Sequence, residues 1–265
     1  MAKRIVMFSG GIGSWAAAKR VAERHGVQDM TLLFTDTLIE DADLYRFLEE
    51  AAASIGAPLV RLADGRTPWQ VFRDERFLGN SRADPCSKIL KRQIADRWLT
   101  EHCDPAETTI YVGIDWTEGH RFDDGKGGGL RPRRAAQGWR YEAPMVEAPY
   151  MWKADMLRAL RAEGIAPPRL YAMGFSHNNC GGFCVKAGQG HFATLLREMP
   201  QRYAEHEDAE QKFRAFIGKN VSMMTDRRGD GRKKPLTMRM LRERIQAGGQ
   251  VEMDQIGGCG CFVEA

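Results

Sequence analysis

The 265-residue chain lacks any apolar run approaching the roughly 18 residues that a membrane-spanning helix needs. Residues 1–4 are followed by only four apolar residues before Ser9, too few for the apolar centre of a secretory signal peptide. A large excess of charge is also missing, because 39 basic and 35 acidic residues leave a net charge of +4. We therefore expect a cytoplasmic protein with no membrane partner, whose small positive charge does not by itself indicate nucleic-acid binding.

Cysteine is scarce, with six residues, and the closely spaced Cys-x-x-Cys pairs that structural zinc prefers are absent. Disulfides are rare in the cytoplasm, so these cysteines are expected to be thiols, cofactor ligands or catalytic groups. A hydrophobic content of 43% is sufficient for a folded core, and the length fits one large domain or one domain with an appendage. Wholesale disorder and a tandem array of domains are therefore excluded.

Short apolar segments alternate with amphipathic segments, which favours a parallel sheet covered by helices. The segments predicted to be strands are 4–8, 30–35, 58–62 and 108–114. Those predicted to be helices are 15–25, 41–55, 86–102 and 152–163, with more helices expected from residue 191. We predict an α/β fold, a Rossmann-like parallel sheet with helices on both faces, plus a C-terminal helical extension. The expected domains are residues 1–190 and 191–265.

Helix starts and one long connection can also be predicted. Asp41, Thr67 and Asp84 are placed to cap helices, the last two directly before a proline. Residues 121–140 are rich in glycine, aspartate and arginine. They are expected to form a flexible surface loop, with a lid over an anionic ligand as the functional alternative.

A glycine-rich turn, Ser9-Gly10-Gly11-Ile12-Gly13-Ser14, joins the first predicted strand to the first helix. Glycines let the backbone approach an anion, and free N–H groups at a helix N-terminus attract it. The turn lacks the Lys-Ser/Thr pair of a Walker A loop and the spacing of a dinucleotide-binding GxGxxG motif. We interpret it as a phosphate loop of another type, to which Ser9 and Ser14 add hydroxyl donors.

Three charged residues lie where the carboxyl ends of parallel strands would meet, which is where such sheets bind ligands. Asp36 is a candidate contact to adenosine or Mg²⁺, with helix capping as the alternative. Glu118 and Arg121 follow the fourth predicted strand. Arg121 could neutralise phosphate charge through bidentate hydrogen bonds, the alternative being a solvated loop arginine.

The pattern Ser9-Gly10-Gly11-x-x-Ser14 resembles the SGGxxS pyrophosphate (PP) loop of the adenine-nucleotide alpha hydrolase-like superfamily. That superfamily includes ATP pyrophosphatases, tRNA thiolation enzymes and sulfonucleotide reductases. The intact glycine pair is typical of the ATP pyrophosphatases, so the resemblance implies ATP rather than a sulfonucleotide.

Further segments are similar, in order, to the phosphoadenylyl-sulfate (PAPS) reductase-like branch. They are 34–37 beside the nucleotide, 113–121 in place of a GxRxxES segment, and 143–184 with its "PL..W...D", "LY..G" and cysteine patterns. The similarity covers about residues 4–190. Asp115 stands where that branch has an arginine, which removes one expected anion contact.

Five cysteines could reach one centre. Cys180 and Cys184 flank two glycines that allow a tight wrap, Cys86 opens a predicted helix whose dipole favours a thiolate, and Cys259 and Cys261 lie near the C-terminus. From the residues alone, a [4Fe-4S] cluster, zinc and redox-active thiols stay open, the cluster being favoured.

The resemblance to the reductase branch implies cluster ligation by Cys180, Cys184 and Cys86. A tail cysteine, Cys261 or Cys259, would be the fourth ligand. Sulfonucleotide reductases also carry a catalytic cysteine on a mobile C-terminal segment, a role for which Cys259 is the candidate.

Other side chains are candidates for the same site. Lys88 and Lys91 are expected to share a helix face and hold a phosphate or sulfate near the cluster, the alternative being an exposed basic face. His177 is either a ligand or proton donor, or a hydrogen-bonded loop histidine. Cys103 is expected to be a small buried residue at a helix end. Nucleic-acid contacts are assigned, as a hypothesis, to Arg131, Arg133, Arg134, Arg227, Arg228, Arg232, Lys233 and Lys234.

The sequence therefore predicts an enzyme that uses Mg-ATP to adenylate an acceptor for iron–sulfur-dependent sulfur transfer. A nucleic acid is one candidate acceptor. The alternatives are a sulfonucleotide reductase and a non-catalytic nucleotide-binding redox sensor. The sequence does not identify the sulfur donor or the reductant. It does not identify the oligomeric state either, and a homodimer is possible.

Overall fold

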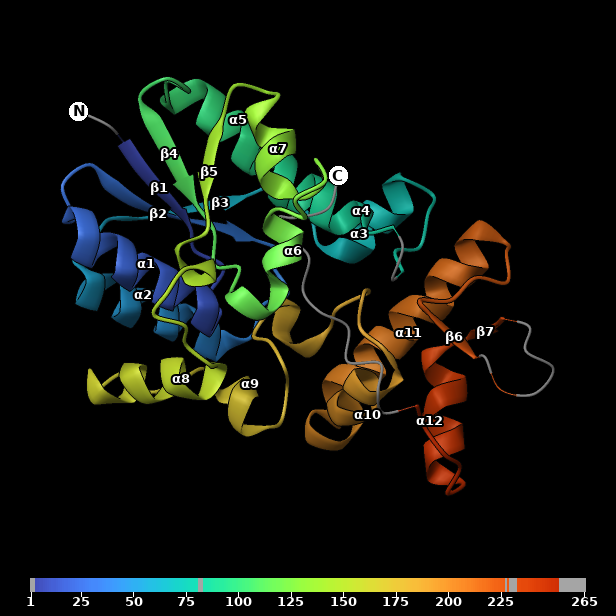
Figure 1. Cartoon of the computed structure of the whole chain (residues 1–265). Helices are drawn as coiled ribbons and strands as arrows, with labels where there is room; N and C mark the ends of the chain where they lie inside the picture. Colours follow the sequence, from blue (N-terminus) through green and yellow to red (C-terminus); the bar gives the residue numbers. More distant parts are fainter. Residues whose placement is uncertain (1–2, 81–82, 227, 229–232, 253–265) are drawn as a thin grey trace.

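The computed structural model describes residues 3–80, 83–226, 228 and 233–252 (Figure 1). Its centre is a sheet of five strands in the order β3-β2-β1-β4-β5, and every pairing is parallel. The strands are β1 (Lys3–Met7), β2 (Met30–Asp36), β3 (Leu59–Ala63), β4 (Thr108–Tyr111) and β5 (Arg140–Glu142). The predicted α/β fold with a parallel sheet is confirmed.

Helices cover both faces of this sheet (Figure 1). On one face lie α1 (Ile12–His25), α2 (Ala42–Ile55) and α8 (Lys153–Ala162); on the other lie α5 (Ile94–His102) and α7 (Leu130–Ala135). Side chains alternate along a strand, so Val6 and Phe8 enter the core under α1 and α2, whereas Ile5 and Met7 enter the core under α5.

A third core lies beside the sheet and contains the later helices. It packs α10 (Gln189–Glu198), α11 (Pro200–Ile217) and α12 (Met238–Gln246) with α3 (Pro68–Asp74). An antiparallel pair of three-residue strands, β6 (Met224–Asp226) and β7 (Lys234–Leu236), interrupts the expected helical extension. Strands this short carry no readable alternation, which is why they were missed. The division at residue 190 stays a prediction.

The helix predicted over residues 86–102 consists of three consecutive pieces. They are α4 (Pro85–Ser87), a π-helical segment (Lys88–Gln93) and α5. Asp41 caps α2 by accepting from Asp43 N, and Thr67 caps α3, as predicted. Asp84 makes no capping bond, because its Oδ1 lies 3.5 Å from the Arg92 guanidinium instead.

The segment expected to be a flexible loop or lid, 121–140, is partly helical. It contains the end of α6 (Gly119–Phe122) and the whole of α7. Leu130 is buried under α5, and Arg134 forms a 2.9 Å ion pair with Asp96 of α5. The expectation of a plain flexible loop is therefore wrong for α7, because an apolar anchor and an ion pair hold this helix on the sheet.

The remaining helices are short. They are α9 (Arg169–Ala172) and three 3-10 turns at Trp116–Glu118, Pro144–Val146 and Cys180–Gly182. Within the described ranges, no helix combines the length and the apolar character needed to cross a membrane.

Candidate functional site

The glycine-rich turn, residues 9–14, connects β1 to α1 at the carboxyl end of the strands. Gly10 has φ +76°, and a Cβ there would lie 2.7 Å from Leu44 Cδ1 of α2. A Cβ on Gly13 would lie 2.8 Å from Gly113 O, just after β4. These two positions therefore require glycine, because α2 and the end of β4 press directly on the backbone.

The two serines of the turn bond within it. Ser14 Oγ donates to Gly11 O at 2.8 Å, and Ser9 Oγ donates to Ser14 Oγ at 3.4 Å. Helix α1 begins at Ile12, so the positive end of a 14-residue helix faces this turn. The backbone has the form that phosphate binding requires, and the nucleotide-binding roles of residues 9–14 stay predictions.

Two distant residues that were not predicted as site residues hold the turn in place. The Ile12 amide donates to the Tyr171 hydroxyl of α9 at 3.0 Å, and Asn178 Nδ2 donates to Gly10 O at 3.1 Å. The Lys153 ammonium lies 4.2 Å from the centre of the Tyr171 ring. The signal in the sequence was the "LY..G" pattern, which contains Tyr171 but does not identify its partner.

Asp36 lies at the end of β2 and is fully buried. Its carboxylate accepts from Leu38 N at 2.7 Å, from Tyr45 Oη at 3.1 Å and from Arg61 Nε at 2.8 Å. Burial, followed by the Asp36 charge, raises the pKa of Tyr45 to about 12. The helix-cap alternative for Asp36 is wrong, because Asp41 caps α2. A contact with adenosine or Mg²⁺ stays a prediction.

Glu118 and Arg121 pair with each other, one helical turn apart, at 2.5 Å. Both follow β4, and α6, which contains Arg121, lies at the carboxyl end of the sheet (Figure 1). The Arg121 side chain is 17% exposed, whereas that of Glu118 is 42% exposed. Arg121 is thus an anchored side chain rather than a solvated loop arginine, and its contact with phosphate stays a prediction.

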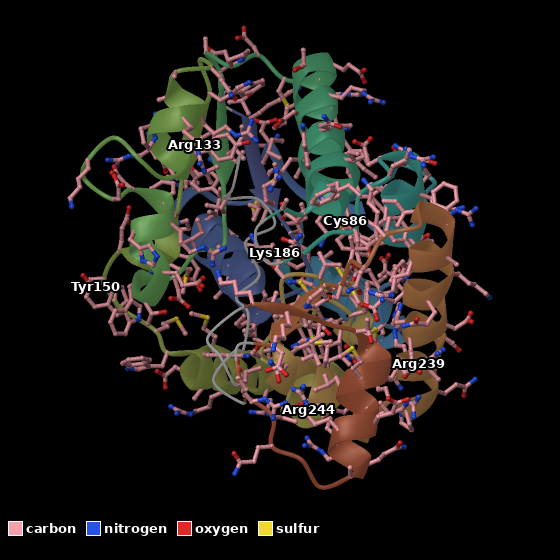
Figure 2. All side chains as sticks on the ribbon, turned by 90° about the vertical axis from the view of Figure 1, so that its right-hand side faces the viewer. Cys86, Arg133, Tyr150, Lys186, Arg239 and Arg244 are labelled. Carbon is pink, nitrogen blue, oxygen red and sulfur yellow. The ribbon has the colours of Figure 1, made fainter. Side chains whose placement is uncertain are left out.

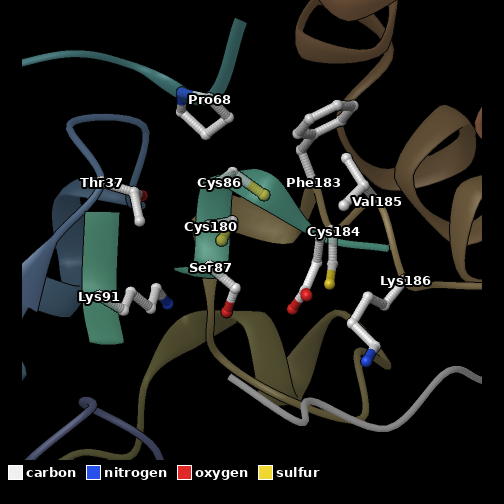
Figure 3. Close-up of a pocket in the computed structure, with 11 residues that line it drawn as sticks. Thr37, Pro68, Cys86, Ser87, Lys91, Cys180, Phe183, Cys184, Val185 and Lys186 are labelled. Carbon is white, nitrogen blue, oxygen red and sulfur yellow. The ribbon is translucent and has the colours of Figure 1, made fainter. Parts of the chain in front are cut away.

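Three of the candidate cluster ligands line one pocket. Cys86 of α4 and Cys180 and Cys184 of the cysteine loop, which we define as residues 178–184, surround it together with Lys91 and Ser87 (Figure 3). Within the part of the chain that the structure describes, none of the three forms a disulfide. Among the described residues, no three His, Cys, Asp or Glu side chains are spaced to hold a single metal ion. Cys259 and Cys261 lie outside the described residues.

The cysteine loop has a tightly wound backbone, as its glycines predict. Cys180, Gly181 and Gly182 have φ values of +52°, +55° and +84°. A Cβ on Gly181 would lie 2.6 Å from Ile39 O, so only glycine fits there. The left-handed Cys180 costs about 1–2 kcal/mol, and such strain is concentrated at functional sites.

The two lysines near Cys86 differ in environment. Lys91 is buried and lines the pocket, with its Nζ 4.0 Å from Glu40 Oε1, whereas Lys88 is exposed. Burial is the main cause that raises the pKa of Glu40. The expectation that Lys88 and Lys91 share one face fails because they lie in a π-helical segment, whose wider turn displaces residues three apart.

Two residues outside the pocket lining can be placed as well. Cys103 directly follows α5, at a helix end as expected, but it is only partly buried against the core under that helix; burial raises its pKa. His177 is not a hydrogen-bonded loop histidine, because neither of its buried ring nitrogens has a partner among the described residues.

The basic residues considered for nucleic-acid contacts do not form one patch. Arg131, Arg133 and Arg134 belong to α7, whereas Lys234 belongs to β7. Figure 2 also shows Arg133 far from Arg239 and Arg244 of α12, two further arginines outside the predicted set. Within the predicted set, Arg131 pairs with Asp123, Arg134 with Asp96 and Arg228 with Asp226. Arg227 and Arg232 lie outside the described residues. Nucleic-acid binding stays a prediction.

No protein-family model matches the chain, and no curated protein does. Among solved structures, phosphoadenylyl-sulfate (PAPS) reductase from Candida auris, in a phosphate complex, is 12% identical over 66% of this chain and 78% of that chain, with a TM-score of 0.44. The NH3-dependent NAD synthetase of Campylobacter jejuni subsp. jejuni NCTC 11168, in complex with the nitrate ion, is 12% identical over 82% and 86%, with a TM-score of 0.41. At these values, the two similarities assign neither a family nor an activity to this chain.

Proposed function

We propose that the chain is an ATP pyrophosphatase-type enzyme that adenylates an acceptor for iron–sulfur-dependent sulfur transfer. One observation carries the proposal: Asn178, two residues before Cys180, donates to Gly10 O at 3.1 Å. The segment that supplies two thiols is thus hydrogen-bonded to the turn suited to phosphates. A nucleotide on the turn and a group held by the thiols would be neighbours.

In the proposed reaction, the phosphates of Mg-ATP bind at the turn of residues 9–14. An oxygen of the acceptor attacks the α-phosphorus, an O–P bond forms, and the bond to the leaving pyrophosphate breaks. The positive end of α1 and the Arg121 guanidinium stabilise the charge that develops on the phosphates. One such preorganised donor typically contributes about 3–4 kcal/mol to a barrier.

The donor set supports a cluster in the pocket. Three thiols with no histidine among the pocket residues form a soft sulfur site, as iron–sulfur clusters require. The ligands would be Cys86, Cys180 and Cys184, with Cys261 or Cys259 as the fourth. A bound cluster would supply sulfur for the step that follows adenylation.

The acceptor is proposed from the reaction alone. Adenylation activates a carbonyl-type oxygen, such as that of a nucleobase, and AMP then leaves as sulfur bonds to the same carbon. A nucleic acid is therefore the candidate acceptor, although the basic side chains are dispersed.

Anaerobic purification, followed by iron, sulfide and zinc analysis and a visible spectrum, tests the cluster. We expect about four irons and four sulfides per chain. Cys180→Ser should lose most of the iron, whereas Cys103→Ser, which alters a described cysteine outside the pocket, should keep it. A colourless protein with zinc, or full iron occupancy in Cys180→Ser, would overturn the cluster assignment.

Release of products from the holoprotein tests the reaction. With Mg-ATP and candidate acceptors, we expect equal amounts of pyrophosphate and AMP. Sulfite release from phosphoadenylyl sulfate, without pyrophosphate release from ATP, would instead identify a sulfonucleotide reductase. Tight ATP binding without either product would identify a redox-sensing module.

A further inference from the structure

Some of the buried polar atoms without a partner belong to the cysteine loop, to the residue before it and to residues near the thiol pocket. Among the described residues, they include both ring nitrogens of His177, Asn178 Oδ1, Glu40 Oε2 and Asp84 Oδ2. An unpaired buried polar atom costs about 1–3 kcal/mol, so such atoms mark places where a ligand or water completes the structure. His177 stands out because neither nitrogen is paired.

Two buried histidines, His191 and His206, show how the protein pairs such a ring elsewhere. His191 has Gly182 O at 2.8 Å from its Nε2, and His206 Nδ1 accepts from Trp69 Nε1 at 3.0 Å. Each therefore has one ring nitrogen paired within the protein. Within the described ranges, both ring nitrogens of His177 have no such protein partner and are available to a ligand.

The position of His177 is fixed from two sides. Its ring stacks on the His191 ring, with centroids 4.9 Å apart and planes 20° apart, and His191 contacts the cysteine loop at Gly182. The next residue, Asn178, is bonded to Gly10 O of the phosphate turn. The imidazole is thus held in the region between the turn and the thiols.

The surroundings of His177 favour an anion. The pKa of His177 is lowered to about 3. Burial is the main cause, followed by the charges of His191, Lys91 and Lys153. Lys91 lines the thiol pocket, and Lys153 lies over the Tyr171 ring that contacts the turn. A neutral imidazole still has one N–H to donate, and the two ammonium groups attract negative charge to its neighbourhood.

We propose that His177 is a nucleotide-binding residue, whose ring N–H donates a hydrogen bond to a phosphate oxygen of the ATP held by the turn. The inference rests on the proposed function only in requiring ATP at residues 9–14. It adds a protein contact to the nucleotide from the residue directly before the cysteine loop. One continuous segment would then both contact the nucleotide and carry two of the thiols.

The first test is spectroscopic and uses the wild-type protein. With ¹⁵N-labelled histidine rings, addition of Mg-ATP should shift the His177 ring signals, while those of His206, in α11, stay in place. Magnesium pyrophosphate should reproduce the shift if the contact is to the phosphates. Unmoved His177 signals in an ATP-saturated protein would refute the inference.

The second test uses variants and ATP affinity by calorimetry. His177→Phe keeps a ring to stack on His191 but has no donor, so the Kd for Mg-ATP should rise by about 10- to 100-fold. His177→Asn or His177→Gln, which keep an N–H donor, should restore most of the affinity. His206→Phe is the matched control for loss of a buried histidine and should change Kd by less than about threefold.

The outcomes separate the two proposals. If the wild-type protein does not bind Mg-ATP, the proposed function fails, and this inference with it. If it binds and His177→Phe binds equally well, only the inference fails. If His177→Phe does not fold, as judged by thermal melting, the wild-type spectrum with Mg-ATP decides the question.

Discussion

Replacing Gly10 by alanine tests whether the phosphate turn is shaped by its packing against α2. Two penalties are expected. The φ of +76° is unfavourable for a residue with a side chain, by about 1–2 kcal/mol. In addition, the new Cβ would lie 2.7 Å from Leu44 Cδ1 and 3.0 Å from Leu44 Cγ. Leu44 is fully buried and cannot move freely, so this overpacking should add about 1–3 kcal/mol.

Gly56→Ala is the matched control. Gly56 has a nearly identical φ of +78°, yet a Cβ there would have no neighbour within 4 Å. Gly56→Ala should therefore lower the free energy of unfolding only by the conformational penalty of about 1–2 kcal/mol. The difference between the two variants in the free energy of unfolding, measured by urea titration, isolates the contact with Leu44.

A double-mutant cycle with Leu44→Ala completes the test. Alone, this variant removes a buried side chain and should cost about 2–5 kcal/mol. Combined with Gly10→Ala, it also removes the clash, so its cost should fall by about 1–3 kcal/mol. Equal stability of Gly10→Ala and Gly56→Ala, together with simple additivity in the cycle, would refute the packing argument.

Two further predictions concern single contacts. Burial raises the pKa of Glu210 to about 7, above its unfolded value, so the folded state holds the extra proton between the two pKa values and stability falls as pH rises. From pH 5 to pH 8, the free energy of unfolding should drop by about 2 kcal/mol more in the wild type than in Glu210→Gln; parallel pH profiles would contradict this. Tyr171→Phe removes the 3.0 Å acceptor of the Ile12 amide and should lower the free energy of unfolding by about 1 kcal/mol in urea titrations. Tyr150 is 61% exposed, so Tyr150→Phe is the control and should not lower the free energy of unfolding. An equal effect of the two variants would contradict the proposed hydrogen bond of Tyr171.

The fold could be predicted where periodic segments are long. β1, β2, α1 and α2 have five to fourteen residues and clear apolar patterns, and each was expected close to its observed place. The three-residue strands β5, β6 and β7 were missed, because three residues cannot establish alternation.

The motifs of the candidate site could be predicted, but the hydrogen bonds that join its distant segments could not. Cys86, Cys180 and Cys184 were expected to converge, and they line one pocket. Tyr171 and Asn178, by contrast, bond to residues 159 and 168 positions away. A single sequence carries no signal for such pairs, because neither partner needs an unusual neighbourhood to make the bond.

The segment that positions both halves of the site is the connection between β2 and α2, residues 37–41. Thr37 lines the thiol pocket and donates to Glu40 at 2.8 Å, and Ile39 O is the atom that excludes a side chain from Gly181. Asp41 caps α2, whose Leu44 presses on the phosphate turn, and also binds Arg169 of α9 at 2.7 Å. Since this one connection contacts the cysteine loop, the pocket and the helix under the turn, a displacement of it should disturb phosphate and thiol geometry together. Variants in these five residues are therefore expected to affect nucleotide affinity and thiol reactivity in parallel.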